Sequence, residues 1–112
     1  MINSKITFDD FKKIEIRIGT IVEATKVPET DRLLKLFIDL GSEKRTIISG
    51  IANFYPDPLV LIGKQVPVLV NLEPRMIKGE ESNGMVLYAL EEEGVLTTLS
   101  PSLPIKNGSI VR

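Results

Sequence analysis

Short runs in which every second residue is apolar constrain the fold of this chain most. The clearest run, Leu34–Leu40, has leucine or isoleucine at every second position, with Lys35, Phe37 and Asp39 between them. Such alternation is typical of a strand with one buried face. Similar patterns predict further strands at Ile14–Ile18, Lys44–Ser49 and Gln65–Leu72, and an apolar run predicts another at Val86–Leu90. The sequence therefore predicts an all-β fold built from short strands.

The order of the predicted elements indicates a small barrel. Gly19 interrupts the first apolar run, and a glycine inside a strand suggests the sharp bend that a closed barrel requires. A short helix is predicted at Pro58–Ile62, because Asp57 can cap it and Gly63 follows its end. Pro67 suggests that the fourth strand is partly an edge. Three strands, a short helix and two strands make up an OB-fold, which is a five-stranded barrel.

The two ends of the chain extend beyond this barrel. Thr7 fits a helix cap, which predicts a short helix through about Lys13. Phe8 and Phe11 would share one face of this helix and pack on the barrel or on a partner subunit. Residues 91–112 exceed what five strands use, so we expect a C-terminal β extension that caps the core or forms an interface.

The length of 112 residues predicts a single domain, 1–112, with its barrel core at about 14–90 and the extension at about 91–112. Hydrophobic residues make up 43% of the chain, enough for a core. No apolar run approaches the roughly 20 residues of a membrane span, and the N-terminus lacks a signal-peptide layout. We therefore expect a soluble, cytoplasmic protein without a membrane partner.

The absence of two residue types limits the catalytic and metal-binding chemistry that this chain can perform. The chain has no cysteine and no histidine, which excludes disulfides, thiolate metal sites and the commonest general base. The acidic run Glu91–Glu93 is more typical of a solvated turn than of a metal site. We expect no catalytic residues, no metal and no cofactor. The net charge of -1 also argues against indiscriminate polyanion binding, so any nucleic-acid binding must come from local placement.

One stretch, Asn71–Met85, carries the densest set of residues that packing alone does not require. Pro74 and two glycines shape it, while Arg75 offers a planar fork of donors suited to phosphate. Its further polar candidates are Asn71, Lys78, Ser82 and Asn83. A solvated hairpin loop is the alternative interpretation.

A second candidate surface lies on the predicted second strand. An outward Phe37 beside an outward Lys35 can stack a base and neutralise a phosphate. Alternatively, a loop or a second subunit covers Phe37. In an OB-fold the oligonucleotide site is formed by the face of the second and third strands and the loops after the first and fourth strands. Both candidate surfaces fall there.

Several short motifs occur in order along the whole chain: Ile16-Arg17-Ile18-Gly19, Leu33-Leu34-Lys35-Leu36, Asp39-Leu40-Gly41, Ser49-Gly50-Ile51, Asn71-Leu72-Glu73-Pro74-Arg75 and Gly79-Glu80-Glu81-Ser82-Asn83-Gly84-Met85. Together they resemble the tRNA-binding domain at the C-terminus of methionyl-tRNA synthetases and in free-standing tRNA-binding proteins. The resemblance implies an OB-fold with a C-terminal extension, usually a homodimer, that recognises folded tRNA by shape. It further implies a stand-alone binder or a trans-acting methionyl-tRNA synthetase beta subunit, without catalytic activity.

The resemblance also implies which residues contact tRNA. Combined with the two candidate surfaces, the expected set is Arg17, Lys35, Phe37, Asn71, Arg75, Lys78, Ser82 and Asn83, with a structural ion pair as the alternative role of Arg17. The chain departs from the family pattern at Glu73 and Met76, where many relatives have lysine, and at Glu80, where an apolar residue is common. These departures remove positive charge from the predicted loop.

Two other functions compete with this one. A branch of the same family acts as an export-related, peptide-binding chaperone, which the low charge and the exposed candidate Phe37 favour. That branch lacks the run seen here at Asp31–Leu36, which favours tRNA binding. The third hypothesis, an enzymatic function, is supported only by the available carboxylates.

Overall fold

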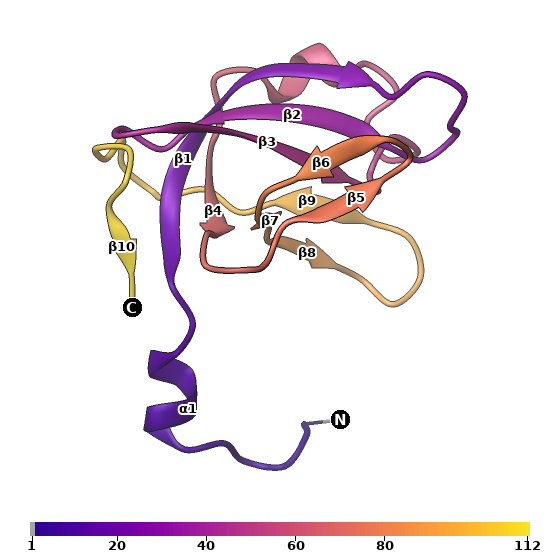
Figure 1. Ribbon diagram of the computed structural model, residues 1–112. Helices are drawn as coiled ribbons and strands as arrows, with labels where there is room; N and C mark the ends of the chain where they lie inside the picture. The colour runs from indigo at the N-terminus through magenta and orange to yellow at the C-terminus, as the bar shows by residue number, and fades with distance from the viewer. Residues whose placement is uncertain (1) are drawn as a thin grey trace.

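The computed structural model describes residues 2–112, which form short strands and two short helices (Figure 1). The helices are α1 (Phe8–Lys12) and the 3₁₀ helix η1 (Pro58–Leu61). The strands are β1 (Ile16–Lys26), β2 (Leu34–Asp39), β3 (Lys44–Ser49), β4 (Gln65–Leu69), β5 (Arg75–Ile77), β6 (Glu80–Ser82), β7 (Met85–Val86), β8 (Tyr88–Leu90), β9 (Leu96–Thr98) and β10 (Ile110–Val111).

The long strand β1 organises a curled sheet with the order β3-β2-β1-β4-β7. Its first residues, Ile16–Thr20, pair with β4, and Thr20–Lys26 pair with β2. The strand continues through Gly19 without the predicted interruption, and its register shifts between Ile21 and Glu23 instead. A Cβ at Gly19 would lie 2.6 Å from Cγ2 of Ile38, so glycine permits close packing where β1 changes partner.

The barrel closes between β3 and the segment that leads into β7. The backbone N–H of Asn83 donates to the carbonyl of Thr46 over 2.9 Å, and the buried Ser82 hydroxyl accepts from the N–H of Ile48 over 2.9 Å. β7 pairs with β4 on its other side. These connections confirm the predicted OB-fold barrel.

The predicted strand Val86–Leu90 is divided in two. The N–H of Leu87 donates to the carbonyl of Pro67 over 3.1 Å, but Pro67 has no N–H to donate in return. The pairing of β4 with β7 ends there, and β8 pairs with β9 in a separate sheet. β4 lies between two strands, yet β7 covers only Val68 and Leu69, so the predicted edge character of β4 is correct in part.

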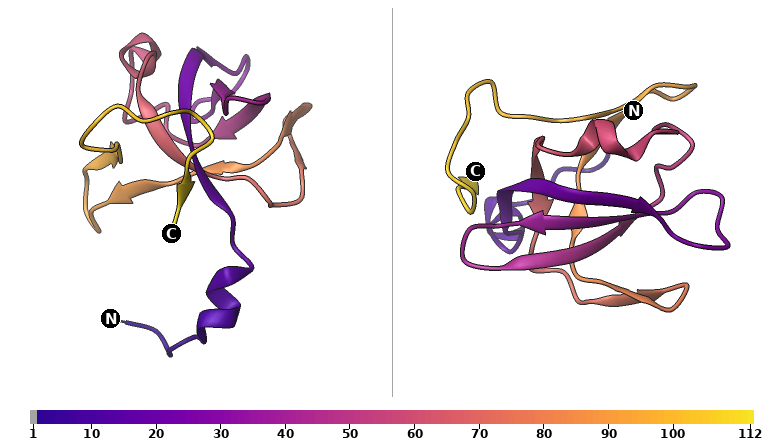
Figure 2. Two further views of the ribbon diagram at one scale, coloured as in Figure 1. Left: turned by 90° about the vertical axis from the view of Figure 1, so that its left-hand side faces the viewer. Right: turned by 90° about the horizontal axis from the view of Figure 1, so that it is seen from above.

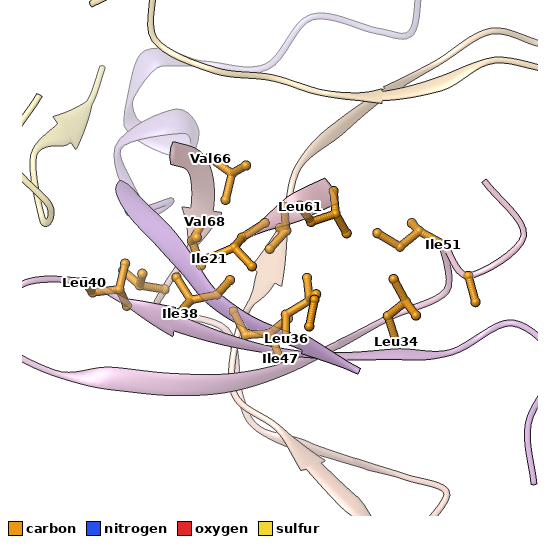
Figure 3. Packing of buried hydrophobic residues seen from close by; sticks show 14 residues of the cluster. Ile21, Leu34, Leu36, Ile38, Leu40, Ile47, Ile51, Leu61, Val66 and Val68 are labelled. Atoms are coloured by element: carbon orange, nitrogen blue, oxygen red, sulfur yellow. The ribbon is translucent and has the colours of Figure 1, made fainter. Parts of the chain in front are cut away.

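Alternating side chains fill the barrel, as the apolar pattern predicted (Figure 3). The largest fully buried residues are Ile21, Leu34, Leu36, Ile38, Ile47, Leu61, Val66 and Val68. Each contributes roughly 1.5–3 kcal/mol relative to an exposed position. Leu61 comes from η1, whose cap, Asp57, accepts from the N–H of Leu59; the predicted helix is confirmed and ends one residue early.

The N-terminal helix α1 projects away from the barrel (Figures 1 and 2). The Thr7 hydroxyl accepts from the N–H of Asp10, as the capping pattern predicted. No residue of α1 is buried, and Phe8 is 73% exposed. Of the two predicted alternatives for Phe8 and Phe11, packing on the barrel is wrong, because α1 projects away from it (Figure 1), and packing on a partner subunit stays a prediction. None of the helices in residues 2–112 is long and apolar enough to span a membrane.

The C-terminal segment packs on the barrel at three places. The Gln65 side chain donates to the carbonyl of Ile105 and accepts from its N–H. β10 pairs with the start of β1, and the β8–β9 hairpin is held by two tyrosines. The Tyr88 hydroxyl donates to Oγ of Ser49 over 3.0 Å, and the Tyr55 hydroxyl accepts from the N–H of Thr98. Burial raises the pKa of Tyr88 to about 12, because the buried site disfavours the charged phenolate.

Candidate nucleic-acid interface

The outer face of β2 presents the first two predicted site residues. Because side chains alternate along a strand, Lys35 and Phe37 point away from the core and are half-buried. Lys35 pairs across the sheet with Ile48, and Phe37 pairs with Thr46. The two side chains are thus neighbours on one face, as the sequence predicted.

The stretch Asn71–Met85 is not a simple loop, because it contains the β5–β6 hairpin. Lys78 and Gly79 form the turn with φ of 51° and 81°, and positive φ at both central residues is characteristic of a type I′ turn. Ser82 connects the hairpin to β3 through Ile48. Nζ of Lys35 lies 3.0 Å from Oε1 of Glu80, a second connection between the hairpin and the barrel.

Two predicted cationic residues on this hairpin are exposed. Arg75 lies in β5 and Lys78 at the turn. Within residues 2–112, no carboxylate approaches either cation within 4.0 Å. Both side chains are available to an anionic ligand.

A pocket of about 460 Å³ lies between the hairpin turn and the loop after β1. Ile77 and Lys78 line it from the hairpin, and the other loop contributes the cation Arg32 together with the acidic residues Glu29 and Asp31. Sequence reasoning did not single out Arg32, although its position in the loop after the first strand could have indicated it. Among the described non-glycine residues, only Glu29 and Lys78 have positive φ, and both line this pocket. Such conformations are frequent at functional sites.

Two of the predicted residues are engaged elsewhere. Asn71 accepts from the N–H of Glu15 over 2.9 Å and donates to the carbonyl of Lys13 over 2.6 Å. Arg17 donates to the Glu15 carboxylate over 2.6 Å and to the carbonyl of Gly108 over 2.7 Å. The contacts of Asn71 fix the segment between α1 and β1, and the contact of Arg17 with Gly108 fixes the C-terminal segment to β1.

The structure thus places most of the predicted residues around one hairpin. Lys35 and Phe37 lie on the sheet, and the hairpin or its exit carries Arg75, Lys78, Ser82 and Asn83. Ser82 is buried, and the side chain of Asn83 is half-buried. No group of three or more acidic side chains that could hold a metal ion occurs in the described part of the chain. The arrangement offers exposed cations on the hairpin, beside a pocket that two cations and two acidic residues line.

The chain is similar in sequence to known proteins over nearly its whole length. Residues 16–110 match the model of the family described as "Putative tRNA binding domain". The chain is 50% identical over 111 residues to methionine–tRNA ligase of Parabacteroides distasonis and 49% identical to that of Bacteroides fragilis. Each match covers 99% of this chain and 16% of the ligase, so the chain spans a small part of these relatives.

Solved structures share the fold over nearly the whole chain. A MetRS-related protein from Pyrococcus horikoshii superposes with a TM-score of 0.92 at 34% identity, covering 98% of this chain and 100% of that one. The chaperone CsaA from Bacillus anthracis superposes with a TM-score of 0.86 at 30% identity, covering 97% of this chain and 100% of that one.

Proposed function

Because this chain belongs to the tRNA-binding domain family, we propose that it is a non-catalytic module that binds folded tRNA. The observation that carries the proposal is a set of exposed cations: Arg75 and Lys78 on the hairpin, and Arg32 in the pocket that Lys78 also lines. None of them has a carboxylate within 4.0 Å in residues 2–112. Phosphates of a folded RNA would be partners for these unpaired cations.

The proposed roles follow from the contacts of each residue. Arg75 and Lys78 bind phosphates, with Lys35 as a further cation on the sheet. Phe37 stacks on a base, and Asn83 donates to sugar or base edges. Phosphate contacts position a ligand without reading its sequence, so this site recognises the shape of tRNA.

The other predicted residues support this surface. Ser82 positions the hairpin, because its hydroxyl is already engaged with β3. Arg17 and Asn71 hold the base of the barrel through the hydrogen bonds that they make there. We assign these three residues structural roles.

We further propose that the module serves methionyl-tRNA synthetase in the cytoplasm, as part of the synthetase, as a trans-acting beta subunit or as a stand-alone binder. The similarity to methionine–tRNA ligases supports this association. Exposed apolar residues at both ends of the chain, including Phe8 and Leu103, support a homodimer. A monomer mass in light scattering at micromolar concentration would contradict the dimer.

A second candidate function is peptide binding as a chaperone, which the similarity to CsaA favours. The chain also has an apolar pocket of about 330 Å³, lined by Ile18, Pro67, Leu99 and Ile105 among others. Protection of an aggregating client protein, without affinity for any RNA, would select this function.

A salt titration of RNA affinity tests the main proposal. We expect folded bulk tRNA to bind more tightly than an unstructured RNA of equal length, with affinity falling as salt rises. Arg75→Ala should weaken binding to all tRNAs similarly and reduce the salt slope by about one. Lys106→Ala is the matched control, since Lys106 is an exposed cation outside the hairpin and the pocket. Equal and negligible affinity for both RNAs would reject tRNA binding.

A further inference from the structure

Lys35, one of the cations of the proposed RNA surface, forms an ion pair with Glu80. The two charged atoms lie 3.0 Å apart, and the side chains are 44% and 33% exposed. Of the ion pairs in residues 2–112, this one alone joins the β5–β6 hairpin to the barrel. Solvent, and therefore a ligand, can reach both partners.

The backbone presents Glu80 to Lys35. Glu80 and Ser82 lie two residues apart in β6, so their side chains share the face directed at the barrel. Ser82 is hydrogen-bonded to Ile48, and Ile48 is the cross-strand neighbour of Lys35. The carboxylate is therefore held over Lys35 by the same geometry that closes the barrel.

A carboxylate accepts hydrogen bonds from an ammonium group as a phosphate oxygen does. We propose that Glu80 is a built-in competitor of RNA phosphate at Lys35, and that it sets the affinity and the salt dependence of this surface. The inference rests on the proposed tRNA-binding function. A phosphate that binds Lys35 must displace Glu80, and the released carboxylate then lies beside the negative charge of the RNA.

Displacement also changes the ion balance. A free lysine that neutralises a phosphate releases about one counterion, which steepens the salt dependence. When Glu80 is displaced, its carboxylate takes up a cation again, so Lys35 contributes almost nothing to the slope. The wild-type slope should therefore undercount the phosphate contacts by about one.

The test compares Glu80→Gln with Glu81→Gln in tRNA binding at several salt concentrations. Both substitutions remove one negative charge from β6, but Glu81 is exposed on the opposite face and has no cation within 4.0 Å in residues 2–112. We expect Glu80→Gln to tighten binding roughly fivefold and to steepen the slope by about one. Glu81→Gln should have a smaller effect on affinity.

Lys35→Ala in the Glu80→Gln background completes the experiment. It should return affinity and salt slope to about the wild-type values, because the freed lysine is removed. Equal effects of the two glutamine variants, or no effect of Lys35→Ala in this background, would overturn the inference. Weaker tRNA binding and a lower Tm in Glu80→Gln would instead show that the pair only fastens the hairpin. If no variant binds tRNA, the proposed function itself fails.

Discussion

Replacing Ser82 by alanine separates a structural role of this residue from direct contact with RNA. The substitution removes the acceptor for the N–H of Ile48 at a buried position. A buried donor left without a partner costs about 1–3 kcal/mol, so we expect a loss of about 2 kcal/mol. With an unfolding entropy of roughly 2.1 cal/mol/K per residue, this loss lowers the Tm of a 112-residue chain by about 8 °C.

The assay pairs thermal unfolding with tRNA binding measured well below the Tm. The hairpin keeps its connections through Glu80 and through the N–H of Asn83, so affinity should change less than about threefold. Ser102→Ala, at an exposed serine, is the control and should change neither quantity. An unchanged Tm with a tenfold loss of affinity would refute the reasoning, because the hydroxyl would then contact RNA directly.

Two further predictions concern the barrel. Gly19→Ala would place a Cβ 2.6 Å from Cγ2 of Ile38, so it should cost about 1–3 kcal/mol in chemical denaturation; Ile38→Leu, which lacks that methyl, should restore part of the loss. Additive effects of the two substitutions would contradict this explanation. Tyr88 has a folded-state pKa of about 12 against 10 in the unfolded chain. Its contribution to the free energy of unfolding, about 2–3 kcal/mol, is therefore complete below pH 10 and is lost as pH rises toward 12. Tyr88→Phe should therefore lose less stability than wild type between pH 10 and 12, and parallel pH profiles would contradict the assignment.

The sequence predicted those features that depend on local periodicity and local backbone chemistry. Alternation with a period of two placed Leu34, Leu36 and Ile38 in the core and turned Lys35 outward, since successive side chains of a strand point to opposite faces. Capping residues located both short helices because a cap satisfies N–H groups within the next few residues. The order of these elements was sufficient for the OB-fold.

Tertiary structure decided which polar atoms remain free for a ligand, because hydrogen bonds and ion pairs depend on partners far away in the chain. Arg17 is engaged by Gly108, 91 residues later, and Asn71 by the backbone before β1. Only folding brings Arg32 to the pocket beside Lys78, and only folding places Glu80 against Lys35. Residue type and spacing determined the fold of this protein. Which of its polar side chains stay available to a ligand depends on long-range contacts that no local pattern encodes.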